Sequence, residues 1–160
     1  MLTQKTSQSF MPALLMVVFL LFPLDAFSDG IRQIEFLQKI GTDKDPYVVT
    51  AKWDSSGMCV DYVLPQYIQT IPGYENGQTM NIHYLDTSYC SELSGAAQLF
   101  EVKSKDHSGR SARLWWEKEI GKDPRARVDE GADPNGLVWI DNTDSNKIKV
   151  WVSYDRKETD

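Results

Sequence analysis

The clearest alternation of apolar and polar side chains lies near the C-terminal end of the chain, over Leu137–Tyr154. Apolar residues occupy every second position there, at Ile148, Val150, Val152 and Tyr154, and the intervening positions hold Lys147, Lys149, Trp151 and Ser153. Residues two apart share one face of a β-strand. The preceding stretch Asn142–Asn146 is rich in Asn and Asp, which bond their own backbone in turns. The pattern therefore predicts a β-hairpin with one apolar face.

The same two-residue period predicts further short strands elsewhere in the chain. They are Tyr47–Trp53, Met58–Leu64, Tyr67–Ile71, Gln78–Leu85, Gln98–Lys103 and Ala112–Lys118. The first two are separated by the turn-like Asp54-Ser55-Ser56-Gly57, so we expect them to form a second hairpin. Its alternation predicts that Trp53 lies in the core and that Cys59 points away from the core.

Two segments are less regular. Over Ile31–Ile40, apolar residues recur every third position, which favours a helix, while the β-branched content favours a strand, and both alternatives stay open. The stretch Gly121–Gly136 is long, charged and contains two prolines. Because compact domains rarely keep structureless connections of this length, it is predicted to be a functional loop.

Many short strands punctuated by turns, with little helical signal, predict an all-β fold. We expect an antiparallel β-sandwich or a small barrel, which can include one short helix near the start of the exported part. Apolar and charged residues occur in ordinary proportions for a globular protein. The length after a leader suits a single β-rich domain, residues 29–160.

The first 28 residues have the features of a secretory signal peptide. A lone Lys5 precedes the apolar run Met11–Leu24, and the small residues Ala26 and Ser28 predict cleavage before Asp29. The run is shorter than the roughly 20 residues that a membrane-spanning helix needs. The sequence therefore predicts a secreted or periplasmic protein without a membrane span after cleavage.

Cysteine content and net charge bear on the disulfide and on the partners that the sequence predicts. The two cysteines, Cys59 and Cys90, both follow the predicted signal, so an oxidising compartment favours a disulfide between them. The formal net charge of −6 makes nucleic acid an unfavourable partner.

Tryptophans on polar strand faces are the main indication of a ligand. Trp115 shares a predicted face with Arg113, and Trp151 shares one with Lys149. An exposed ring flanked by polar groups can contact the apolar face of a sugar or a partner protein. Trp115, Trp151, Arg113 and Lys149 are therefore the predicted ligand-binding residues. The alternative is that each ring lies beneath a loop or a second sheet.

Calcium is the one cofactor that the sequence suggests. Asp141, Asn142, Asp144 and Asn146 supply several oxygen atoms within one predicted turn, and calcium prefers oxygen ligands. Their spacing differs from that of the helix–loop–helix calcium site. The alternative is an Asn- and Asp-rich turn without metal.

These features lead to a function prediction without an assigned catalytic residue. We expect a lectin- or adhesin-like binding protein, with carbohydrate as the ligand. The first alternative is a protein-binding module, such as an enzyme inhibitor or a toxin component. The second is a hydrolase that uses loop carboxylates such as Asp129, Glu130 and Asp133. The oligomeric state is not predicted.

Overall fold

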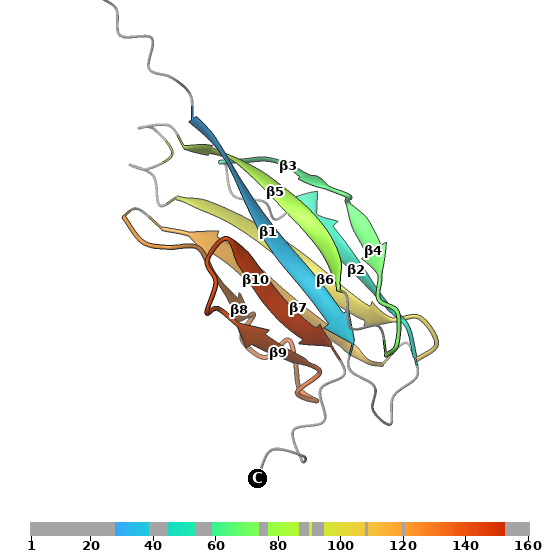
Figure 1. The fold of residues 1–160 in the computed structure, drawn as a ribbon. Coiled ribbons are helices and arrows are strands. Elements are labelled where there is room, and N and C mark those ends of the chain that lie inside the picture. The colour runs from blue at the N-terminus through green and yellow to red at the C-terminus, as the bar shows by residue number, and fades with distance from the viewer. Residues whose placement is uncertain are drawn as a thin grey trace, which may run out of the picture.

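The computed structural model describes residues 28–38, 45–53, 59–73, 77–86, 90, 95–107, 109–119 and 121–152. Within these residues the elements are all strands (Figure 1). They are β1 (Ser28–Gln38), β2 (Tyr47–Lys52), β3 (Val60–Leu64), β4 (Tyr67–Gln69), β5 (Gln78–Asp86), β6 (Ala96–Ser104), β7 (Ser111–Lys118), β8 (Arg125–Val128), β9 (Val138–Asp141) and β10 (Lys147–Val152).

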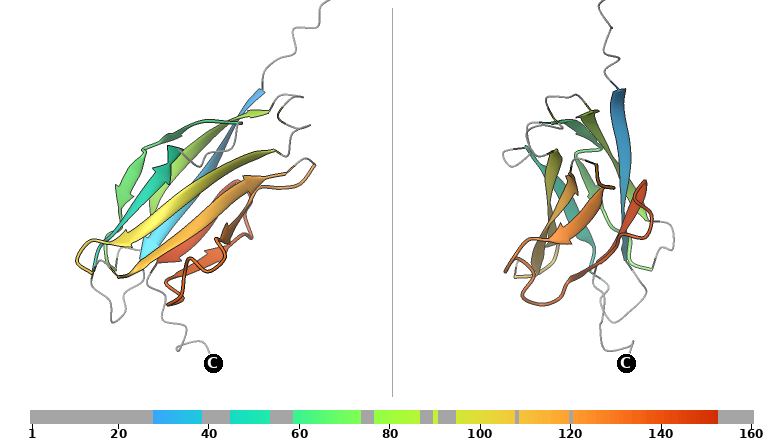
Figure 2. Two further views of the ribbon diagram at one scale, coloured as in Figure 1. Left: turned by 180° about the vertical axis from the view of Figure 1, so that it is seen from behind. Right: turned by 90° about the vertical axis from the view of Figure 1, so that its left-hand side faces the viewer.

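The strands form two five-stranded sheets packed face to face, so the predicted β-sandwich is confirmed. The first sheet has the order β3-β5-β1-β10-β9, and the second has the order β4-β2-β6-β7-β8. The right-hand view of Figure 2 separates β1 from β7, which belongs to the other layer. Neighbouring strands are antiparallel except β1 and β10, which pair in parallel. The sandwich is therefore not purely antiparallel, because the first and the last described strands lie side by side.

The core between the sheets is built from every second residue of the strands, as the two-residue period requires. Phe36 of β1 faces Phe100 of β6, with ring centroids 5.8 Å apart, and Tyr84 of β5 faces Trp116 of β7 at 5.6 Å. In the C-terminal hairpin the alternate residues Ile148, Val150 and Val152 are fully buried. The hairpin itself is confirmed, because β9 and β10 pair in antiparallel register.

The helix alternative for the first segment is wrong, because Ser28–Gln38 forms strand β1. Ile34 points into the core, whereas Ile31 and Leu37 lie an odd number of residues away and occupy the outer face. Apolar residues on both faces of one strand therefore produced the apparent three-residue spacing.

The predicted hairpin of Tyr47–Trp53 with Met58–Leu64 is also wrong. β2 pairs with β4 and β6 in the second sheet, whereas β3 pairs with β5 in the first. The sequence between them therefore leads from one layer to the other. Local turn composition indicates where a strand ends but does not select its partner.

A bulge changes which residues of β3 face inward. The register with β5 shifts between Val60 and Tyr62, so that Val60 and Val63 are both buried. One extra residue in a strand reverses the alternation beyond it. Tyr62 and Leu64, which the sequence pattern grouped with Val60, therefore face outward.

Two side chains lie where strict alternation did not place them. Cys59 belongs to the core cluster, because it precedes β3 in a turn instead of lying within the strand. Trp53 follows the last residue of β2 and is 42% exposed, so the prediction that it lies in the core is wrong. Both exceptions occur just beyond a strand end, where the two-residue period no longer applies.

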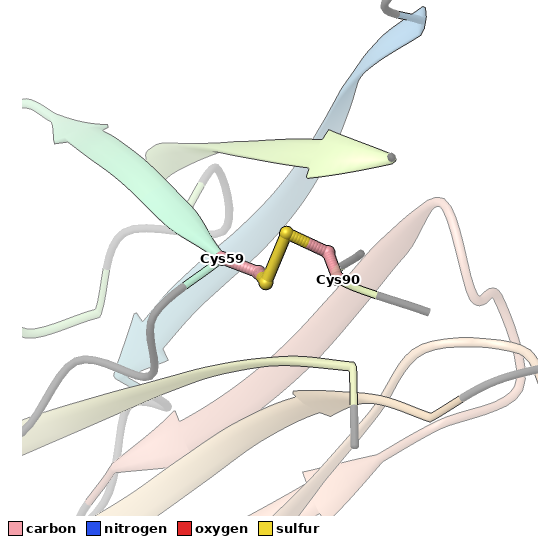
Figure 3. Close-up of a disulfide and its surroundings, with 2 residues drawn as sticks. All are labelled: Cys59 and Cys90. Atoms are coloured by element: carbon pink, nitrogen blue, oxygen red, sulfur yellow. A yellow bond between two sulfur atoms is a disulfide. The ribbon is translucent and has the colours of Figure 1, made fainter. Parts of the chain in front are cut away.

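The predicted disulfide between Cys59 and Cys90 is confirmed (Figure 3). It joins the residue before β3 to the connection that leaves β5 for the second sheet.

The predicted loop Gly121–Gly136 is shorter than expected, because β8 lies within it and pairs with β7. The sequence pattern gave little indication of β8, because only Ala126 of its four residues is buried.

Residues 1–27 lie outside the described residues, so the predicted signal peptide stays a prediction. Ser28, its last predicted residue, pairs through the backbone with Asp86 at the beginning of β1. Among the residues that the structure describes, no helix has the length and apolarity needed to cross a membrane.

Gly95 directly precedes β6 and lies beside Lys118 at the end of β7. Its φ is +85°, and an added β-carbon would lie 1.8 Å from the carbonyl oxygen of Lys118. We expect Gly95→Ala to lower the free energy of unfolding by about 1–3 kcal/mol, since the backbone must move or adopt a strained conformation. Urea unfolding measures this loss. Gly109→Ala is the control, because an added β-carbon there would meet nothing within 4 Å, and an equal loss in both variants would contradict the account.

Candidate ligand-binding face of the first sheet

The outer face of the first sheet carries an aromatic surface made by three adjacent strands. Trp151 of β10 is in register with Leu37 of β1 on one side and with Trp139 of β9 on the other. We call these three residues the tryptophan row. Because Val150 and Val152 point into the core, the indole of Trp151 points outward. Trp139 is 46% exposed, Trp151 is half-buried, and Leu37 is buried beside them.

Directly opposite residues of an antiparallel pair have β-carbons about 4.5–5.5 Å apart. Trp139 and Trp151 therefore start from directly opposite positions on the same outer face. Trp139 was not assigned to a face from the sequence, because its neighbours Val138 and Ile140 are both apolar. The register with β10 decides its orientation.

A row of charged residues lies next to the tryptophan row on the same face. Lys149 is in register with Glu35 of β1 and with Asp141 of β9. Glu35 is only 7% exposed and forms an ion pair with Lys147, with 3.1 Å between Oε1 and Nζ. Each acid thus has a lysine beside it, so this part of the face offers hydrogen-bonding groups with little net charge.

Asp141 is held in its ionised form. A hydrogen bond from the Thr143 side chain lowers the pKa of the Asp141 carboxyl most, followed by one from the Thr143 backbone N–H, 2.9 Å from Oδ1. The charge of Lys149 lowers this pKa further. A carboxylate that stays ionised to lower pH is a steady acceptor for hydroxyl donors.

Trp115 and Arg113 lie on the outer face of the second sheet, on the other side of the molecule from Trp151. The Trp115 indole N–H donates to Oδ1 of Asp129 at 3.3 Å, and Nη2 of Arg113 lies 3.0 Å from Oδ2 of the same carboxylate. The predicted ligand-binding residues are therefore divided between two faces. Trp151 and Lys149 belong to the tryptophan and charged rows, whereas Trp115 and Arg113 are joined to each other through Asp129.

Ion pairs surround Trp115 on the second sheet. Glu117 pairs with Arg127 at 2.7 Å, and Glu119 pairs with Arg125 at 2.6 Å and with Lys122. The bond to Glu117 raises the pKa of Arg127, and the bond from Lys122 lowers the pKa of Glu119. The basic side chains clustered in this part of the sequence are thus largely matched by acids.

The predicted calcium ligands form the hairpin turn between β9 and β10. Asp144 Oδ1 accepts from the Asn146 N–H at 2.9 Å, and the Asn146 carbonyl accepts from the Gln33 N–H at 3.0 Å. The Asn142 amide forms two hydrogen bonds with the backbone of Ala126, at 2.7 and 2.9 Å, which join this turn to the second sheet. In the described ranges, no group of three or more His, Cys, Asp or Glu is placed to hold a metal. Calcium binding stays a prediction.

The loop acids considered for hydrolysis contact the backbone and other side chains. Both carboxylate oxygens of Asp133 accept backbone N–H groups, from Leu137 at 2.6 Å and from Val138 at 3.0 Å. Asp129 is engaged by Arg113 and Trp115. Contacts within the fold therefore account for the positions of both Asp129 and Asp133.

Compared with known proteins, the chain matches no family model, no curated protein and no solved structure. The interpretation of the tryptophan row therefore depends on the chemistry of its own residues.

Proposed function

We propose that this protein is a secreted or periplasmic, non-catalytic binding protein whose ligand is carbohydrate. The observation that carries the proposal is the register pair Trp139–Trp151 on an outer sheet face, next to Glu35, Lys149 and Asp141. An indole face packs well against the C–H groups on one side of a sugar ring. The adjacent Asp141 carboxylate and Lys149 ammonium group accept from and donate to the hydroxyls at the ring edge.

The disulfide supports the proposed location. Structural disulfides persist in oxidising compartments outside the cytoplasm and are rare within it. The Cys59–Cys90 bond therefore indicates an extracytoplasmic protein. The signal peptide predicted over residues 1–28 agrees with export.

A sugar fits the tryptophan row better than a protein partner does. Stable protein interfaces bury roughly 800 Å² on each partner, with an apolar centre and few charges. Here the exposed apolar side chains of the tryptophan row are Trp139 and Trp151, and the neighbouring Glu35, Lys149 and Asp141 are charged. A narrow aromatic surface beside hydrogen-bonding groups corresponds to the two kinds of surface on a sugar ring.

A glycan array followed by titration calorimetry tests the proposal. We expect Trp139→Ala to weaken binding of the retained glycan at least roughly tenfold, since the variant loses the more exposed indole. Trp53→Ala is the matched control, because Trp53 is exposed to a similar degree but follows β2 of the second sheet.

Two results would contradict carbohydrate binding on this face. One is an array that retains no glycan. The other is a glycan that binds Trp139→Ala and Trp151→Ala as tightly as the unmodified protein.

A further inference from the structure

A second aromatic cluster lies on the same outer face of the first sheet. Tyr62 of β3 and His83 of β5 are register partners, and their rings stack with centroids 4.0 Å apart and planes 23° from parallel. His83 is also in register with Ile31 of β1, which is 51% exposed. We call Tyr62, His83 and Ile31 the tyrosine row. Their neighbours Val63 and Ile82 are buried, so these side chains point outward.

The tyrosine row and the tryptophan row lie at opposite ends of one continuous surface. β1 contributes a residue to each of its four rows, namely Ile31, Gln33, Glu35 and Leu37. Leu37 follows Ile31 by six positions, so at about 3.3 Å per position the rows are roughly 20 Å apart. That distance is several times the size of one sugar ring.

Between the two aromatic rows the surface is polar over β5, β1 and β10, and the exposed Leu64 lies beside Asn81 at the β3 edge. Gln33 Nε2 donates to Asn81 Oδ1 at 3.1 Å, and Lys147 is the next residue across the sheet. Lys147 is paired with Glu35, and Lys149 lies beside Asp141. Two acids and two lysines thus balance one another on this surface. A neutral ligand with many hydroxyl groups fits it, because each of these fixed charges has a partner of opposite sign.

We propose that the ligand is a neutral, extended glycan chain that spans this face, with one end on the tryptophan row and the other on the tyrosine row. This inference rests on the proposed function, because it assigns the ligand class to the same face. The amides of Gln33 and Asn81 face the middle of the chain. A single terminal sugar would occupy only one of the aromatic rows.

A length series of oligosaccharides tests the span. The probes are the disaccharides and hexasaccharides of the neutral cello-, chito- and malto-series, titrated by calorimetry. We expect a hexasaccharide to bind about tenfold or more tightly than the disaccharide of its series. The double variant Tyr62→Ala/His83→Ala should remove that gain, so that the hexasaccharide binds no more tightly than the disaccharide, whereas Trp139→Ala should weaken both.

Controls separate failure of the span from failure of the proposed function. Tyr67→Ala changes an exposed tyrosine of the second sheet and should alter neither affinity. Equal affinities for disaccharide and hexasaccharide, or a double variant that binds the hexasaccharide as well as the unmodified protein, would overturn the span while carbohydrate binding stands. Absence of binding in all three series and on the array would overturn both.

Discussion

Replacing Trp116 with alanine is expected to lower the free energy of unfolding by about 3–5 kcal/mol, the usual cost of truncating a buried tryptophan. Trp116 is fully buried on β7 and packs against Tyr84 of the opposite sheet. Its loss leaves a cavity between the layers at a point where both contribute aromatic rings. Urea denaturation followed by circular dichroism measures the change.

Two further variants show that this cost comes from lost core volume. Trp116→Phe keeps most of the volume, and its loss of the indole N–H breaks no hydrogen bond, since that group has no partner in the described structure. It should therefore cost less than the alanine variant. Trp139→Ala should change stability by no more than about 0.5 kcal/mol, as is usual for exposed positions. A Trp139→Ala variant as unstable as Trp116→Ala would show that the tryptophan row belongs to the core.

Removal of the disulfide by the double change Cys59→Ala/Cys90→Ala is expected to destabilise the protein by about 3.7 kcal/mol. The figure follows from the sequence separation of 31 residues, because cross-linking a loop of that length restricts the unfolded chain. Both sulfur atoms belong to residues of the core cluster, so their loss also reduces core packing.

The measurement compares urea unfolding of the oxidised protein, the reduced protein and the double variant. The oxidised protein should unfold at the highest urea concentration, and the other two should resemble each other. Equal midpoints for the oxidised protein and the double variant would contradict a stabilising role for the bond. Gly109→Ala again serves as a substitution without expected effect.

The sequence predicted well those features that depend on neighbouring residues. The hairpin of β9 and β10 was predicted because Ile148, Val150 and Val152 alternate with polar residues over a strand with one buried face. The disulfide was predicted because only two cysteines are present and both follow the predicted leader. Both inferences need no knowledge of distant strand partners.

Errors arose where distant pairing or a local irregularity decides the outcome. The bulge after Val60 reversed the inward face of β3 without any clear sign in the residue pattern. One of the two partners of β2 is β6, some fifty residues further along the chain, and turn composition cannot indicate it. β8 was missed because it is short and has a single buried side chain, Ala126.

The candidate site was predicted only in part for the same reason. Alternation placed Trp151 and Lys149 on the polar face of their strand, which is where they lie. It could not show that Trp115 belongs to the other sheet, nor that β1 brings Leu37 and Glu35 beside Trp151 and Lys149. The proposed ligand-binding face is therefore a product of sheet topology, because its rows combine residues that lie far apart in the sequence.

The parallel pairing of β1 with β10 has a consequence for how the protein matures. β1 is a central strand, yet one of its two partners is the last described strand to be synthesised. Because β10 follows β1 by more than a hundred residues, the first sheet cannot be completed until that part of the chain has been made. The first sheet therefore depends on pairing between residues far apart in the sequence, and such non-local pairing slows folding.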